Sequence, residues 1–206
     1  MDKIATHPSG LQIVFNEEAH SYLVGDEKYL SVTKLIHGLF PEFDTDKVAG
    51  KFAKKHGRTK DDVLMEWEAK NREACEYGTN VHLYAENLLL GKPLPEPINE
   101  KASECFPVLD KFIDKLQQRY NLIDSEKIVF SPKYKISGTV DLIMQHKKTG
   151  NIVVMDWKTN KAIKRSNDYG ERGLGFLRHI HHCNYMHYQL QSVSYTHLTL
   201  PTNREV

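Results

Sequence analysis

The chain has 206 residues, a length that fits one domain with its own hydrophobic core. Its 28 lysines and arginines balance 27 aspartates and glutamates, so the formal net charge is +1, and overall charge gives no signal for nucleic-acid binding. Hydrophobic residues make up 40% and charged residues 27%, which excludes collagen-like, coiled-coil and wholly disordered chains.

The apolar runs are far shorter than the roughly 20 residues that a membrane span needs, and the N-terminus lacks the apolar segment of a signal peptide. The three cysteines are widely separated, which suggests no disulfide framework and fits a reducing compartment. We therefore expect a cytoplasmic protein with no membrane partner.

The first half of the chain predicts a β-region followed by helices. Apolar and polar residues alternate over residues 11–30, which predicts a β-hairpin or meander. Ser31 is expected to cap a short helix that ends near Gly38. Residues 46–90 are rich in Ala, Lys, Glu and Leu and predict two or three helices, whereas the three prolines within residues 91–97 predict a loop.

The second half predicts a helix, then a sheet. Apolar residues at helical spacing favour a helix over residues 100–119. A charged, mobile loop is expected over residues 160–180, and a further helix from Asn184. Between them lie three strand-like runs, the last two joined by a hairpin turn, at residues 126–134, 136–145 and 150–158.

The strongest candidate site combines Asp141 with Asp156 and Lys158. Asp156 and Lys158 are two residues apart in an expected strand and therefore point to the same face, beside the strand that carries Asp141. Carboxylates bind hard cations such as Mg²⁺, and a lysine beside them can orient water and stabilise negative charge. The alternative is an ordinary surface hairpin with a salt bridge.

Two helices add polar pairs that share a face. His82 and Glu86 are four residues apart, and His82 can offer a neutral imidazole nitrogen to a metal. Tyr188 and Gln191 are three residues apart and can hydrogen-bond a phosphate or a base, or help to order the lysine. An ordinary exposed helix face is the alternative for each pair.

In chain order these residues form the pattern GTxxH…E, GxxD, DxK and YxxQ, starting at Gly78, Gly138, Asp156 and Tyr188. The pattern resembles the PD-(D/E)XK nuclease superfamily, in its RecB-like and phage-exonuclease-like branch, over roughly residues 10–191. The resemblance implies an α/β (α+β) fold with a restriction-endonuclease-like core, in which helices flank a mixed central sheet that follows an N-terminal β-hairpin. It also implies one or two Mg²⁺ or Mn²⁺ ions.

By this resemblance the chain is a metal-dependent DNA nuclease, an exonuclease or end-processing enzyme of replication, recombination or repair. The expected metal ligands are His82, Asp141 and Asp156, with Lys158 as the catalytic lysine. Asp156 replaces the more usual Glu of the family pattern. Supporting roles are expected for Glu86, Tyr188 and Gln191. The alternative function is a non-catalytic DNA-binding or assembly module that retains the nuclease fold.

The expected partner is DNA, single-stranded or at duplex ends, with replication or recombination proteins as further partners in a bacterial cell or a phage-infected host. Candidate phosphate contacts flank the site, at Lys133, Lys135, Lys161, Lys164 and Arg165, although a merely solubilising surface is the alternative. An iron–sulfur cluster is not expected as a cofactor, because the chain has only three cysteines and they are widely separated. A zinc role is also less expected than a solvated loop for the set His179, His181, His182, Cys183 and His187.

Residues 192–206 read SVSYTHLTLPTNREV and resemble the translated reading frame of a transposase-type sequencing adaptor. We therefore expect one nuclease domain over residues 1–191, truncated at its C-terminus, followed by a non-native tail. A genuine C-terminal strand and tail is the alternative.

Overall fold

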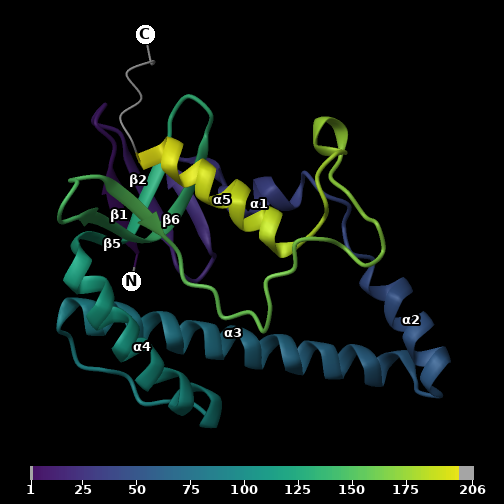
Figure 1. Cartoon of the computed structure of the whole chain (residues 1–206). Coiled ribbons are helices and arrows are strands. Elements are labelled where there is room, and N and C mark those ends of the chain that lie inside the picture. The colour runs from purple at the N-terminus through teal and green to yellow at the C-terminus, as the bar shows by residue number, and fades with distance from the viewer. Residues whose placement is uncertain (1, 200–206) are drawn as a thin grey trace. The chain divides into compact units, whose positions relative to one another are not determined.

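The computed structural model describes residues 2–199 (Figure 1). Within them the chain forms two compact units. The helical unit consists of Glu42–Arg119 together with the short segment Trp157–Thr159. The sheet unit consists of the remaining described residues.

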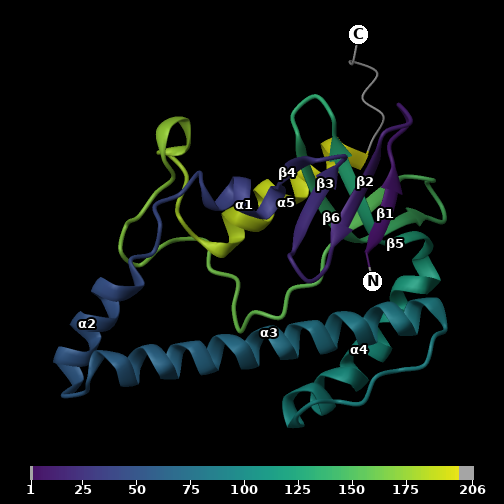
Figure 2. The same cartoon turned by 180° about the vertical axis from the view of Figure 1, so that it is seen from behind.

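The sheet unit begins with an antiparallel meander of four short strands (Figure 2). The alternating sequence of residues 11–30 forms three of them, as expected, and the first strand was not expected from the sequence. In this first strand Ile4 pairs with Val14. The strands are β1 (Lys3–Thr6), β2 (Gln12–Asn16), β3 (Ser21–Val24) and β4 (Glu27–Ser31).

Strand β6 (Ile136–His146) is the centre of the seven-stranded mixed sheet. One edge of β6 pairs antiparallel with β5 (Tyr120–Ser131). Two strands pair elsewhere along β6: β4 runs parallel to it at Ile136 and Ser137, and β7 (Ile152–Met155) runs antiparallel to its residues 142–145. Residues 138–141 of β6 therefore lie between the two stretches that pair with β4 and β7.

Two helices pack together in the sheet unit, α1 (Val32–His37) and α5 (Asn184–Thr199) (Figure 1). Ser31 caps α1 as expected, because its side chain accepts a hydrogen bond from the Lys34 N–H at 3.2 Å. The two helices share a hydrophobic cluster with strands β5 and β6, which contains Val32, Ile36, Phe40, Val129, Val140, Ile143 and Tyr195. A second cluster joins the meander to β5 through Ile13, Phe15, Tyr22, Tyr29, Ile128 and Phe130.

The helical unit contains α2 (Thr45–His56), α3 (Lys60–Leu90) and α4 (Glu100–Arg119). Helices α2 and α3 thus occupy the region of residues 46–90, where two or three helices were expected. Helix α4 has the expected bounds, residues 100–119. Both α2 and α3 end at a glycine in the left-handed region, Gly57 and Gly91. The expected loop after Gly91 is held by Asn80, whose amide donates to the Glu96 carbonyl at 3.0 Å.

The expected boundaries of two strands were wrong. The strand expected over 150–158 covers only Ile152–Met155, and the strand expected over 126–134 covers Tyr120–Ser131. Helix α5 begins at Asn184 as expected and includes residues 192–199. The adaptor origin of 192–206 stays a prediction, and residues 200–206 lie outside the described residues.

The structure shows a mixed α/β fold with a seven-stranded mixed sheet and an N-terminal hairpin region. Residues 160–180 contain only a short 3-10 helix, Gly175–Leu177, and a single bridge between Arg172 and His181. None of the helices in the described residues has the length and hydropathy that a membrane span requires.

Candidate metal centre

Two carboxylates face each other across neighbouring strands of the sheet. Asp141 lies on β6, as expected, and Glu126 on β5 stands opposite it, between the pairs Ser125–Leu142 and Lys127–Val140. Both residues are half-buried, and a carboxylate oxygen of one lies within 4.8 Å of a carboxylate oxygen of the other. This separation suits two ligands of a single cation.

The two facing carboxylates repel each other, and the Lys3 ammonium group, 3.8 Å from a Glu126 carboxylate oxygen, offsets part of that repulsion. Like charges placed opposite each other on antiparallel strands destabilise the sheet. Protonation of one carboxyl group or binding of a cation relieves that repulsion. Glu126 also has a φ of 49°, in the left-handed region that non-glycine residues seldom adopt. Backbone strain of this kind is concentrated at functional sites.

Asp156 comes directly after β7. Met155, the residue before Asp156, pairs with Leu142, the residue after Asp141. Asp156 Oδ1 accepts a hydrogen bond from the Gln191 amide at 3.4 Å, and the same amide nitrogen donates to the Tyr195 hydroxyl at 3.2 Å. Gln191 therefore links α5 to Asp156, and the supporting role expected for it stays a prediction.

Two tyrosines lie close to these carboxylates. The Tyr22 hydroxyl shares a hydrogen bond of 2.8 Å with Thr139 Oγ1, and burial, with a smaller effect of Glu126, raises the pKa of Tyr22. Burial is also the main cause that raises the pKa of Tyr195, with Asp156 and Asp141 adding to it. Both phenols therefore stay neutral and can act as hydrogen-bond partners near the carboxylates.

Gly138 of the GxxD pattern has a packing role. A Cβ atom at this position would lie 2.6 Å from Cε1 of Tyr195. The glycine thus allows the Tyr195 ring of α5 to approach the β6 backbone, three residues before Asp141.

The structure corrects the argument that placed Lys158 on the same strand face as Asp156. Because β7 ends at Met155, strand periodicity does not apply to Asp156, Trp157 and Lys158. Lys158 is exposed and belongs to the helical unit. Its neighbour Trp157 packs against Phe112 of α4, with 5.9 Å between ring centroids.

His82 and Glu86 both lie on α3, half-buried, at the helical spacing that the sequence predicts. Glu86 forms an ion pair of 3.3 Å with Lys92. Both residues belong to the helical unit, and the approach of His82 and Lys158 to the carboxylates stays a prediction.

Tyr188 lies on α5 and donates a hydrogen bond to the Asn160 side chain. Burial, and secondly the charge of Asp156, raises the pKa of Tyr188. Tyr188 and Gln191 therefore both act on the region around Asp156, as their shared helix face suggests.

The expected phosphate-contacting residues are largely engaged with neighbours. Lys135 forms an ion pair with Glu27, and Lys164 forms one with Asp168 at 2.8 Å. Each of two others lies over a tyrosine ring: Lys133 over Tyr134 at 5.4 Å and Arg165 over Tyr185 at 5.0 Å. Lys161 is exposed. Their contact with DNA stays a prediction.

The histidine-rich segment is less solvated than expected. His182 and His187 are half-buried and stack at 5.1 Å, and both rings contact Phe40. These histidines and Cys183 do not form a group with metal-ligand spacing in the described part of the chain.

Sequence reasoning missed Glu126, Tyr22 and Tyr195. Glu126 lies among other polar residues, and only its register opposite Asp141 distinguishes it. Tyr195 lies within residues 192–206, which the sequence predicts to be a non-native tail. Comparison with protein-family models, with curated proteins and with solved structures finds no match to this chain.

Proposed function

We propose that this chain is a Mg²⁺- or Mn²⁺-dependent DNA nuclease of the PD-(D/E)XK type, with exonuclease or end-processing activity. The observation that carries the proposal is the facing pair Glu126 and Asp141, which supplies the oxygen ligands that a hard cation prefers. Asp156, directly after the strand that pairs with the Asp141 strand, would add a third carboxylate.

The donor set fits the metal. Carboxylate oxygens suit Mg²⁺ and Mn²⁺ better than they suit soft ions. Glu126, Asp141 and Asp156 would hold the ion, and His82 would complete the ligand set from α3. The bound ion would supply charge neutralisation at the scissile phosphate and lower the pKa of water.

Side chains of this chain would orient the attacking water and position the metal ligands. The ammonium group of Lys158 would orient the attacking water in line with the leaving oxygen and stabilise the extra negative charge on the phosphate. Gln191 would hold Asp156 in place through the hydrogen bond to Oδ1. Attack by water breaks one P–O bond and leaves one strand end with a phosphate and the other with a hydroxyl.

The test is hydrolysis of labelled single-stranded and duplex DNA with Mg²⁺ or Mn²⁺. We expect Asp141→Asn, Glu126→Gln and Lys158→Met each to lower the rate about 100-fold or more, because each removes a ligand or the charge beside the phosphate. Asp26→Asn, an exposed change in the turn between β3 and β4, is the matched control and should retain the rate.

Equal rates in wild type and Asp141→Asn would overturn the assigned site. DNA binding without any metal-dependent cleavage by the wild-type chain would instead favour the non-catalytic module. Titration with Mn²⁺ alone gives a second readout, because the Asp141 and Glu126 variants should lose metal affinity whether or not cleavage is detected.

A further inference from the structure

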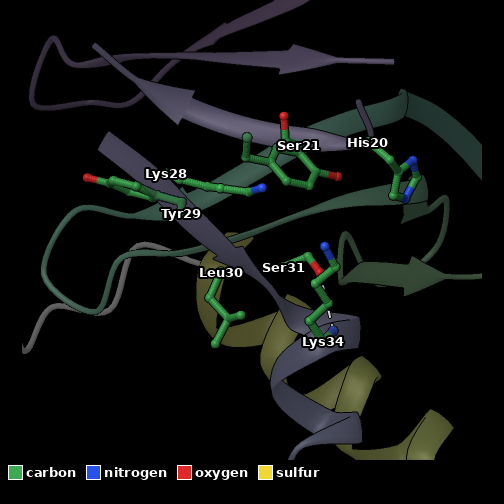
Figure 3. Close-up of a pocket in the computed structure, with 8 residues that line it drawn as sticks. His20, Ser21, Lys28, Tyr29, Leu30, Ser31 and Lys34 are labelled. Atoms are coloured by element: carbon green, nitrogen blue, oxygen red, sulfur yellow. Dashed lines mark hydrogen bonds between the residues drawn. The ribbon is translucent and has the colours of Figure 1, made fainter. Parts of the chain in front are cut away.

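A hollow of about 220 Å³ lies in the sheet unit beside the meander (Figure 3). It is formed by the turn before β3, by β3 and β4, and by the start of α1. The lining residues that matter here are His20, Ser21, Tyr22, Lys28, Ser31 and Lys34. Figure 3 labels His20, Lys28 and Lys34, which line this hollow from three different segments.

The charged side chains that line the hollow are all basic. Lys28, Lys34 and His20 are basic, and none of the eight lining residues is acidic. Within residues 2–199, no carboxylate forms an ion pair with Lys28 or Lys34, whereas nearby Lys135 pairs with Glu27. Two ammonium groups around one hollow without a counter-charge favour an anion.

Hydroxyl groups supply further donors. Ser31 Oγ accepts the Lys34 N–H bond at 3.2 Å, so its own proton remains available for a ligand. Ser21 is buried and also lines the hollow. Ammonium and hydroxyl donors around one point match the oxygens of a phosphate group.

The size of the hollow limits the ligand. Sites for drug-sized ligands and cofactors measure roughly 300–1,000 Å³, so 220 Å³ fits one phosphate group better than a whole nucleotide cofactor. The buried ring of Tyr29 and the side chain of Leu30 complete the lining with apolar surface. Such a wall would suit the sugar that a phosphate diester carries.

Tyr22 connects the hollow to the candidate metal centre. Its ring lines the hollow, and its hydroxyl is bonded to Thr139, two residues before Asp141 on β6. Two residues of strand span about 7 Å. The hollow and the strand that carries Asp141 therefore both contact this tyrosine.

We propose that the hollow lined by Lys28, Lys34 and His20 binds a backbone phosphate of a nucleic-acid strand that also reaches the carboxylates. This inference rests on the proposed nuclease function for the identity of the strand. The recognising chemistry is two ammonium groups and hydroxyl donors on a phosphate group, so free phosphate is the second source of the same ligand chemistry.

The experiment compares the double variant Lys28→Gln/Lys34→Gln with the double variant Lys147→Gln/Lys148→Gln, which removes two exposed lysines from the β6–β7 turn. Binding of a fluorescent single-stranded DNA is measured by anisotropy in EDTA over a range of salt concentrations. EDTA prevents metal-dependent cleavage, so this result does not depend on whether the chain is a nuclease.

We expect the hollow variant to bind several-fold more weakly and to lower the slope of log K against log salt by about 0.7 to 1, whereas the control variant keeps both values. A second arm titrates inorganic phosphate alone and follows it by ³¹P NMR. Weaker binding of both ligands by the hollow variant supports the proposal.

Two results would overturn it. If the hollow variant loses inorganic phosphate but binds DNA as the wild type does, the site takes a free anion and the nucleic-acid assignment is wrong. If neither ligand distinguishes the hollow variant from the control, the hollow is not a phosphate site. Absence of cleavage with intact strand binding would count against the nuclease function alone.

Discussion

Glu126 combines two features that oppose folding, a carboxylate facing Asp141 and a left-handed backbone. In the absence of a divalent cation we expect Glu126→Gln to be more stable than the wild type by up to about 1 kcal/mol, since one of two facing charges is removed and the loss of the weak 3.8 Å ion pair with Lys3 offsets only part of that gain. Addition of Mg²⁺ should reverse the order, because only the wild type gains binding free energy. Urea unfolding in EDTA and in Mg²⁺ measures both.

Asp26→Asn again serves as the control, because it removes an exposed carboxylate from the sheet unit without touching the facing pair. Its stability should respond to Mg²⁺ as the wild type does. If Glu126→Gln is less stable than the wild type in EDTA and still gains stability from Mg²⁺, the facing pair is not a cation site.

At the residue scale the sequence predicts part of the candidate site. Asp141 and Asp156 are indicated by the GxxD and DxK spacing, and the β6–β7 hairpin, as expected, pairs the strand of Asp141 with the strand that ends directly before Asp156. Glu126 is not predictable in the same way, because its role depends on the register of β5 against β6. That register shifts between Leu122 and Asp124, and no local pattern marks the shift.

At the scale of elements, α5 connects the core to the candidate site. Tyr195 is buried in the cluster with Val32 and Val140, and its ring occupies the space above Gly138. Gly138→Ala should therefore cost about 1–3 kcal/mol in unfolding free energy, because the new methyl group would overlap the ring. Chemical denaturation measures the cost.

The same substitution in a Tyr195→Leu background should cost less, since the smaller side chain leaves room for the methyl group. The difference between the two costs is the coupling energy of this contact. Equal costs in both backgrounds would show that Gly138 is required for a reason other than the approach of Tyr195.

Helix existence was easier to predict from sequence than strand length. Residues 100–119 carry apolar residues at helical spacing, and α4 has those bounds. The strand expected over 150–158 is shorter because Trp157 packs with Phe112 instead of continuing the ladder. Residues 192–199, which resemble an adaptor sequence, continue α5 and include the buried Tyr195, and their non-native origin stays a prediction.

At the scale of the whole molecule, the histidines around Phe40 predict a pH dependence of stability. His187 packs against Phe40, with His182 and His37 beside it, and His182 in turn lies 3.4 Å from Glu171. Burial, then the charges of His182 and His37, lowers the pKa of His187 from 6.5 to about 4.

Between these two pH values the unfolded chain binds a proton at His187 that the folded chain does not. The free energy of unfolding should therefore be fully maintained above pH 6.5 and fall as the pH is lowered toward 4. Because the ring is only half-buried, solvent screening reduces the effect, and we expect His187 to account for about 1–2 kcal/mol of the loss.

Urea unfolding at a series of pH values tests this, with His187→Gln and the exposed His179→Gln as a matched pair. His187→Gln should flatten the pH dependence between 6.5 and 4, because no titrating group remains at that position. His179→Gln should keep the wild-type slope. If both variants lose stability with pH as steeply as the wild type, the acid sensitivity arises elsewhere in the chain, and the packing of α5 against Phe40 does not depend on a neutral His187.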